Sequence, residues 1–157
     1  MTETGFVPKA RYMMRALELA AQAAAMGEVP VGAVVVQKST GRIIGEGYNR
    51  READRSPLAH AEIMAIDAAS RTLGGWRLLD SALYVTLEPC PMCAGAILHA
   101  RLEQVVYGTA DPKGGAVDSV EQLFTLPYNW TPEVHAGLLQ AECAQVLRDF
   151  FRGLRKK

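Results

Sequence analysis

The stretch LYVTLEPCPMCAGAILHARL, residues 83–102, joins two kinds of secondary structure. Residues 82–87 are apolar and β-branched enough to predict a strand, and residues 91–99 predict a helix that begins at Pro91. Cys90 and Cys93 therefore lie where a strand ends and a helix begins. Thiolates at a helix N-terminus are stabilised by its unpaired N–H groups and its dipole, so we expect both sulfurs to converge on one point as anions.

Outside this stretch, helical and strand patterns alternate along the chain. They predict helices from about Met13 to Gly27, at 59–73 and at about 138–157, and strands at 29–36, 42–47 and 104–107. The first two strands read as a hairpin whose first strand is buried on both faces. Interleaved elements of this kind predict an α/β fold, a three-layer α/β/α sandwich with a central mixed sheet and helices on both faces.

Composition limits the possible functions. The chain has 157 residues, 49% of them hydrophobic, which suits a single domain over 1–157. Its 17 basic and 17 acidic residues balance, so a nucleic-acid partner must be recognised through a local patch. We see no signal-type leader and no apolar run near the roughly 18 residues of a membrane span, and we expect a soluble cytoplasmic protein with no membrane partner.

The cysteine pair has several possible uses. Three cysteines are an odd number, which argues against a disulfide framework in a reducing compartment. A CxxC pair alone fits a thioredoxin-like redox site or half of a zinc ribbon, but the chain has no second CxxC. His60, in PLAHAEI at 57–63, supplies a third ligand at the start of another helix. Three protein ligands leave one tetrahedral position open for water, which is typical of a catalytic zinc site.

Glu62 adds a proton carrier to this candidate site. A carboxylate beside a zinc-bound water can take its proton and later deliver it to a leaving group. Residues two apart on a helix point to different sides, so His60 and Glu62 converge only if the metal lies across the mouth of the helix.

His60-Ala61-Glu62 together with Pro89-Cys90-Pro91-Met92-Cys93 resembles the HxE and PCxxC signature of the zinc-dependent cytidine/deoxycytidylate deaminase superfamily. Further stretches resemble the bacterial tRNA-specific adenosine deaminases within it: EVPVGAVVV, GEGYNR, PLAHAEIMAI, VVYGTADPKGGA and ECAQVLRDFFR. The resemblance covers nearly the whole chain. It implies a cytidine-deaminase-like fold, a homodimer, and hydrolysis of adenosine to inosine at the wobble position of a tRNA anticodon.

The resemblance also implies residue roles. His60, Cys90 and Cys93 would hold one Zn²⁺ per chain, and Glu62 would shuttle the proton. Asn49 matches an asparagine that contacts the flipped base, and Asp111 an acidic residue near the target nucleotide. One departure is Val117-Asp118, where many relatives have a second glycine, so the loop at 114–119 is expected to bend differently.

Plainer interpretations stay open for several residues. Asn49 and Asp111 also suit simple turns. Glu88 is expected to fix local backbone rather than take part in chemistry, and His99, His135 and Cys143 are expected to be structural because none has a neighbour at ligand spacing.

A basic stripe on the last helix, Arg148, Arg152 and Arg155, has two interpretations. It fits a solvated helix face, or phosphate contacts with a tRNA anticodon stem-loop. We take Arg152 as a substrate-binding residue.

The functional prediction is a tRNA adenosine deaminase that needs zinc and no organic cofactor. The alternative on the same fold is a deaminase of a free base, nucleoside or nucleotide, of the guanine, cytosine or cytidine type. A non-catalytic zinc-stabilised binding module is a third possibility, which Glu62 and the open fourth position argue against.

Overall fold

The computed structural model describes residues 5–155. Its helices are α1 (Ala10–Ala25), α2 (Ala61–Leu73), α3 (Pro91–Ala100) and α4 (Gln140–Arg155), with a short 3-10 helix η1 (Leu123–Thr125). Its strands are β1 (Gly32–Gln37), β2 (Arg42–Tyr48), β3 (Ser81–Leu87), β4 (Gln104–Thr109) and β5 (Glu133–Ala136). No helix among these residues is long and apolar enough to cross a bilayer.

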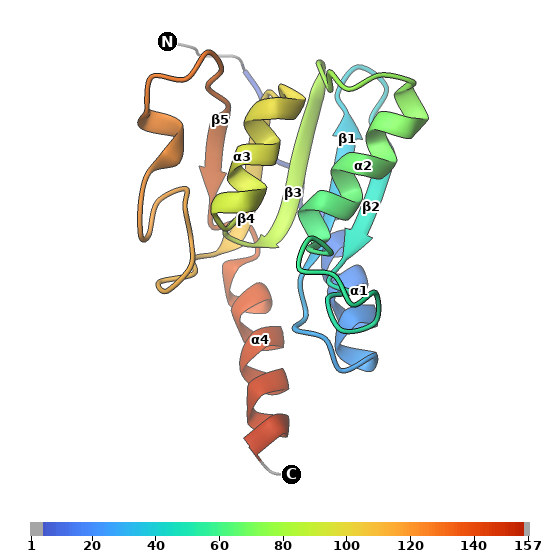
Figure 1. Cartoon of the computed structure of the whole chain (residues 1–157), viewed down its shortest axis with the longest axis vertical. Helices are drawn as coiled ribbons and strands as arrows, with labels where there is room; N and C mark the ends of the chain where they lie inside the picture. Colours follow the sequence, from blue (N-terminus) through green and yellow to red (C-terminus); the bar gives the residue numbers. More distant parts are fainter. Residues whose placement is uncertain (1–4, 156–157) are drawn as a thin grey trace.

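The five strands form one mixed sheet in the order β2-β1-β3-β4-β5. β1 runs antiparallel to both β2 and β3, while β3, β4 and β5 are parallel. Figure 1 shows α2 and α3 on one face of the sheet and α1 on the other. The predicted three-layer α/β/α sandwich with a mixed central sheet is confirmed.

Each face of the sheet has its own apolar core. On one face, alanines of α2 and residues of α3 pack against strand residues such as Val35, Val85 and Val105. On the other, Met13 and Leu19 of α1 and Cys143 of α4 pack against the alternate residues, among them Val34 and Val106. Successive strand residues point to opposite faces, so a sheet covered on both sides needs continuous apolar runs. The expectation that β1 is buried on both faces is confirmed.

Helix α2 lies unusually close to strand β2. A β-carbon at Gly45 would lie 2.3 Å from the carbonyl oxygen of Ala65, and one at Gly47 would lie 2.4 Å from that of Ala61. Only glycine permits such an approach of two backbones. The two glycines therefore fix the start of α2, and with it His60, against the end of the sheet.

Several predicted boundaries and one element differ from the structure. The first helix runs from Ala10 to Ala25 rather than from about Met13 to Gly27, and the last begins at Gln140 rather than at about 138. β1 begins at Gly32 rather than at Val29, because Pro30 has no N–H to donate to the ladder. α2 begins at Ala61 rather than at Ala59, with His60 as its N-cap. β5 was not predicted: its sequence, EVHA, has no apolar pattern and becomes a strand by parallel pairing with β4.

The last helix is apolar on one face but is only partly covered. Cys143 in its first turn, and Leu139 just before it, contact the core. Figure 1 shows α4 projecting beyond the end of the sheet where α2 and α3 begin. Phe151 and Leu154, near its end, are 44% and 48% exposed. Residues 156 and 157 of the predicted basic helix lie outside the described residues.

Candidate metal centre and active site

His60 lies at the N-terminus of α2, and its imidazole does not cap the helix. It is the N-cap residue, but its side chain makes no cap hydrogen bond. Asn49, at the end of β2, performs that task instead: its Oδ1 accepts a hydrogen bond of 3.0 Å from the Ala61 backbone N–H. A helix needs acceptors for its first N–H groups, and here a remote asparagine supplies one. The His60 ring can therefore face the cysteines.

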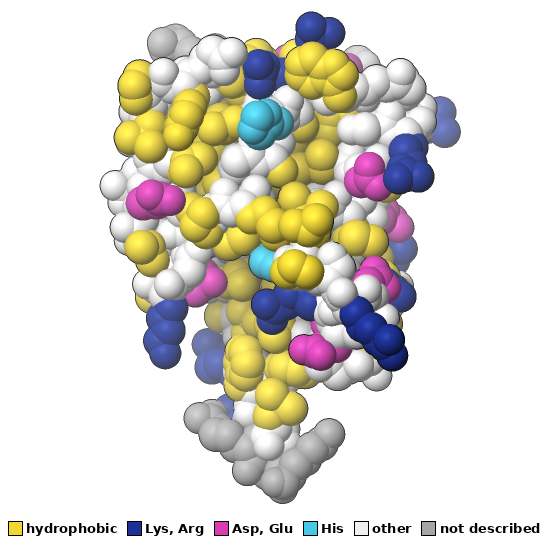
Figure 2. All heavy atoms as spheres, in the orientation of Figure 1, with side chains coloured by type: hydrophobic (Ala, Val, Ile, Leu, Met, Phe, Trp, Pro, Cys, Tyr) yellow, Lys and Arg dark blue, Asp and Glu magenta, His cyan; other side chains and the backbone are white. Residues whose placement is uncertain are grey.

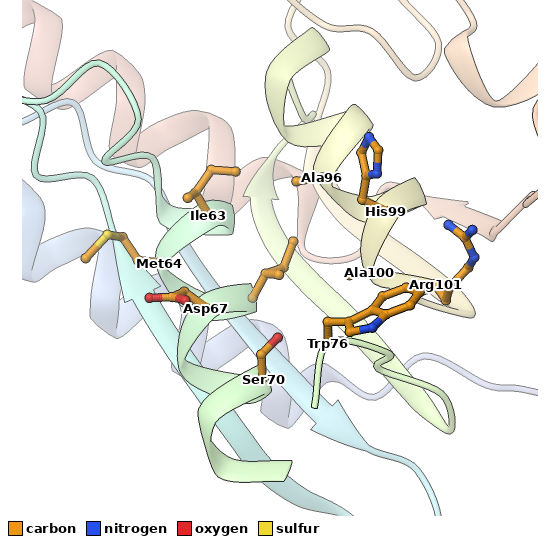
Figure 3. A pocket seen from close by; sticks show the side chains of 10 residues that line it. Ile63, Met64, Asp67, Ser70, Trp76, Ala96, His99, Ala100 and Arg101 are labelled. Carbon is orange, nitrogen blue, oxygen red and sulfur yellow. The ribbon is translucent and has the colours of Figure 1, made fainter. Parts of the chain in front are cut away.

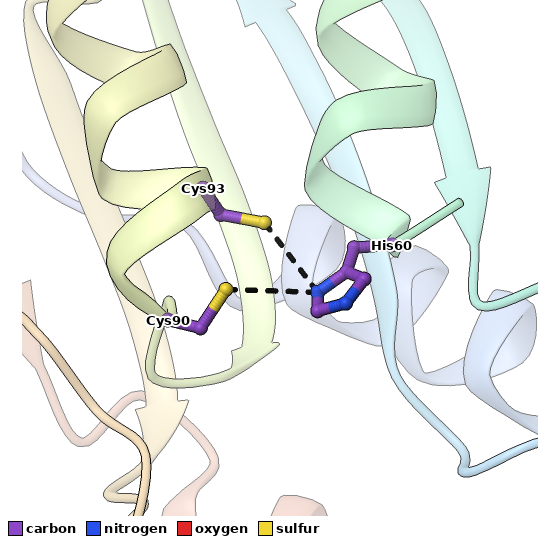
Figure 4. A group of neighbouring side chains, drawn as sticks. All are labelled: His60, Cys90 and Cys93. Carbon is purple, nitrogen blue, oxygen red and sulfur yellow. Dashed lines mark hydrogen bonds between the residues drawn. The ribbon is translucent and has the colours of Figure 1, made fainter. Parts of the chain in front are cut away.

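Cys90 and Cys93 stand at the N-terminus of α3. Cys90 is the N-cap and Pro91 follows in the first turn, as the sequence predicted. Both Sγ atoms lie 3.7 Å from Nδ1 of His60, and the three candidate ligand atoms lie within 4.8 Å of one another (Figure 4). One nitrogen and two sulfurs at this spacing fit a tetrahedral zinc ion with one position open to water. The donor set therefore fits zinc.

The protonation of the three groups is consistent with a cation site. The Cys93 thiol donates toward Cys90 and, with His60, lowers the pKa of Cys90 to about 4 despite its partial burial. The same interaction and deep burial raise the pKa of Cys93. The Cys90 thiolate also raises the pKa of His60. Zinc held here would bind both sulfurs as thiolates, so its binding would release the proton that the two thiols share.

Glu62, in the first turn of α2, lines a cavity beside His60 and Cys90. Its side chain is 4% exposed, and burial raises its pKa to about 7. A carboxyl whose pKa lies near neutrality can both accept and release a proton at the pH of a cell. Glu62 lines the same cavity as His60 and Cys90, so His60 and Glu62 face one place although they are two positions apart.

A cavity of about 200 Å³ opens beside these groups. Its lining includes five residues proposed from the sequence, and these are Asn49, His60, Glu62, Cys90 and Asp111. Cys93 lies buried behind them. Arg152, on α4, is not part of the lining.

Asn49 and Asp111 are both engaged with backbone as well as with the cavity. Besides capping α2, Asn49 donates one hydrogen bond from Nδ2 to the Val29 carbonyl at 3.1 Å. The structure assigns no acceptor among the described residues to the second hydrogen of this amide. Oδ1 of Asp111 accepts from the backbone N–H groups of Lys113 and Gly114, each at 3.2 Å. Asp111 therefore forms the turn that the plainer interpretation expected. It also lies in the cavity wall, where a substrate would contact it.

The sequence did not single out several residues of the cavity wall. Arg51 follows Asn49 after β2, Leu87 ends β3, and Val29 and Val31 precede β1. These residues lie together because the ends of neighbouring strands meet at one edge of the sheet. Predicting them therefore requires the strand order, which sequence patterns alone do not give.

The expected structural residues lie away from the cavity. Cys143 is buried, and a β-carbon at Gly108 would lie 2.3 Å from its Sγ, so the third thiol fills the core under β4. His135 lies on β5 with Nε2 3.4 Å from a Glu133 carboxylate oxygen. His99 lines a separate groove between α2 and α3.

A deaminase family model, the MafB19-like deaminases, matches residues 7–155. Among curated proteins, the chain is 48% identical over 147 residues to a tRNA-specific adenosine deaminase of Bacillus subtilis, covering 93% of this chain and 90% of that one. It is 50% identical over 147 residues to a tRNA-specific adenosine deaminase of Haemophilus influenzae, covering 92% and 84% of the two chains.

Solved structures resemble the chain over nearly the same extent. A structure from work on A-to-I editing by tRNA:A34 deaminases at the wobble position of transfer RNA has a TM-score of 0.85 and 44% identity, covering 88% of this chain and all of that one. A guanine deaminase from Nitrosomonas europaea has a TM-score of 0.79 and 27% identity, covering 92% and 85%.

Proposed function

Since the chain belongs to the tRNA-specific adenosine deaminases, we propose that it hydrolyses adenosine to inosine at the wobble position of tRNA anticodons, with one zinc ion per chain. The observation that carries this proposal is the convergence of His60, Cys90 and Cys93 beside the buried carboxyl of Glu62. A zinc-stabilised binding module has no use for a buried acid at an open coordination position.

The chain's own residues account for the proton transfers of this reaction. When zinc is held by His60, Cys90 and Cys93, it lowers the pKa of a bound water to about 7. Glu62 takes a proton from the attacking water and delivers it to the ring nitrogen beside the amino-bearing carbon. The remaining proton of the added water passes to the amine, the carbon–nitrogen bond breaks, and ammonia leaves while the oxygen stays on the ring as the carbonyl of inosine. Water is the only co-reactant, so the reaction uses no organic cofactor.

The size of the cavity constrains how the substrate is presented. About 200 Å³ beside the ligands accommodates one base and not a paired duplex. The target nucleotide must therefore leave its stack and enter the cavity, which is easiest in an unpaired loop. In this arrangement Asn49 offers its free amide hydrogen to the base, and Asp111 lies at the mouth beside the target nucleotide.

We place the tRNA backbone along α4. The helix projects from the end of the sheet where α2 and α3 begin (Figure 1). Arg148 and Arg152 are exposed on it. Arg152 pairs only loosely with Asp149, at 3.5 Å with both side chains more than half exposed, and so stays available to a phosphate. A substrate role for Arg152 would thus be exerted at a distance from the chemistry.

Neutralising Arg148 and Arg152 together should weaken tRNA binding and flatten its salt dependence. Each lost phosphate contact should reduce the log–log slope of affinity against salt by up to about 1. Binding of an anticodon stem-loop at several salt concentrations measures the slope. Zinc content and thermal stability should stay near those of the wild type, because exposed charges contribute under about 1 kcal/mol. An unaltered slope would leave these arginines as a solvated helix face.

We also propose that the enzyme is a homodimer joined across the α2–α3 face. A groove of about 500 Å³ runs between these helices, lined by Ile63, Ile66, Ala96 and the exposed ring of Trp76 among others (Figure 3). Figure 2 shows hydrophobic side chains gathered on this face. An apolar groove beside an exposed Trp76 ring is suited to contact with another protein surface. Sedimentation of the purified protein tests the proposal, and a monomer at micromolar concentration would contradict it.

The remaining assignments follow from the proposed substrate. We propose a single deaminase domain, as expected over 1–157, and a place in the cytoplasm, where tRNA is processed; the match of the deaminase family model to residues 7–155 supports the first. No membrane partner is needed for this reaction.

The resemblance to a guanine deaminase keeps a free base as the alternative substrate. Ammonia release separates the two possibilities. The purified enzyme should release ammonia from tRNA with an adenosine at the wobble position, and not from free adenosine, guanine or cytosine. Ammonia release from a free base, with none from tRNA, would show that the enzyme is a free-base deaminase instead.

A further inference from the structure

Glu88 is a buried carboxylate that the proposed chemistry does not use. It lies two residues before Cys90, is 2% exposed, and lines the cavity. Oε2 accepts backbone N–H groups from Val117 at 3.1 Å, Asp118 at 2.7 Å and Ser119 at 2.9 Å. Oε1 accepts the Asp111 backbone N–H at 3.0 Å and the Ser119 hydroxyl. A buried carboxylate with so many donors stays ionised and is rigidly held.

These contacts gather one loop, residues 111–119, around a single side chain. The loop is held near both of its ends, at Asp111 and at 117–119. A β-carbon at Gly115 would lie 2.2 Å from Cδ of Glu88, so the loop wraps the carboxylate closely enough to require glycine there. The Tyr107 hydroxyl contacts the Asp118 carboxylate, which adds a second attachment. Asp118 is therefore a fixed point of this loop.

The anchored loop carries Asp111 to the mouth of the cavity. Its backbone N–H is held by Glu88, and its carboxylate closes a turn with Lys113 and Gly114. The position of Asp111 is thus fixed through its backbone by Glu88 and through its carboxylate by the turn. Loss of the Glu88 carboxylate would release the backbone on which Asp111 stands, with no direct change at His60, Cys90 or Cys93.

We propose that Glu88 is a positioning residue that acts through Asp111 to seat the target nucleotide at the mouth of the cavity. The proposal rests on the proposed tRNA substrate. It assigns Glu88 to substrate binding rather than to metal binding or proton transfer.

Glu88→Gln tests this role because it keeps the volume of the side chain and replaces one acceptor oxygen by an NH₂ group. At least one of the held N–H groups then loses its charged acceptor. We expect KM for an anticodon stem-loop to rise roughly tenfold or more, by the size of a lost charge-assisted hydrogen bond, with kcat within about threefold of wild type. Zinc content should remain one per chain. Glu121→Gln, an exposed glutamate just beyond the loop, is the matched control and should change neither constant.

A double-mutant cycle with Asp111→Ala separates positioning from general destabilisation. If Glu88 acts through Asp111, Glu88→Gln should raise KM far less in the Asp111→Ala background than in the wild type. Ser119→Ala, which removes one donor only, should shift KM in the same direction by a smaller factor and serves if Glu88→Gln does not fold. The inference is overturned by multiplicative effects in the cycle, by an unchanged KM, or by zinc loss that parallels the loss of activity. A wild-type enzyme inactive on tRNA would instead overturn the proposed function.

Discussion

Replacing Glu62 by glutamine should remove most of the deaminase activity while the protein keeps its zinc and its fold. The side chain is assigned to proton transfer, and such a group contributes roughly 10² to 10⁴ in rate. Glutamine has almost the same volume and can neither accept nor deliver the proton. We expect kcat on a tRNA substrate to fall by a factor in this range, measured as inosine formed per enzyme, with KM little changed.

The stability of the same variant provides an independent check. Burial raises the pKa of Glu62 to about 7, so the ionised carboxyl is disfavoured in the folded protein. An acid with a raised folded-state pKa reduces stability as pH rises above its unfolded value and toward 7. A neutral glutamine avoids that penalty, and the melting temperature at neutral pH should not fall. If Glu62→Gln loses zinc as a ligand variant does, Glu62 is a ligand and this mechanism is wrong.

Replacing Cys90 or Cys93 by alanine should lower zinc content and stability as well as activity, unlike Glu62→Gln. Either change leaves two protein ligands, and the free energy of metal binding is also folding free energy. Zinc content, measured by atomic spectroscopy, should fall from about one per chain to a small fraction, with loss of activity and a clear drop in melting temperature.

Cys143→Ala is the matched control for these variants. It removes the third thiol, which is buried like Cys93 but lies in the core under β4. It should lower the melting temperature modestly, as small core truncations do, and keep full zinc. Full zinc occupancy in Cys90→Ala and Cys93→Ala would refute the site.

The sequence predicts the metal centre better than it predicts the wall around it. His60 and the cysteine pair each begin a helix, and helix starts can be recognised from local residues such as Pro91. Arg51, after β2, and Leu87, at the end of β3, reach the same cavity only because β2, β1 and β3 are neighbours in the sheet, a property of topology. β5 follows the same rule: EVHA becomes a strand through the edge that β4 offers it.

Two polar residues show a further limit of local patterns. Asn49 suits a turn by its sequence neighbours, yet its side chain caps a helix that begins 12 positions later. Glu88 was expected to fix local backbone, and it does hold backbone, but the segment it holds is 23 to 31 positions away in the chain. Buried polar groups seek partners in space, and the partners follow from the fold.

The most direct test of the central claim is the location of inosine in tRNA incubated with the purified, zinc-loaded protein. Sequencing of the treated tRNA should show inosine at the wobble position of an anticodon that carries adenosine there, and at no other adenosine. The same incubation with Glu62→Gln should leave the tRNA unmodified. Unmodified tRNA from the wild-type enzyme, together with ammonia release from a free base, would contradict the assignment.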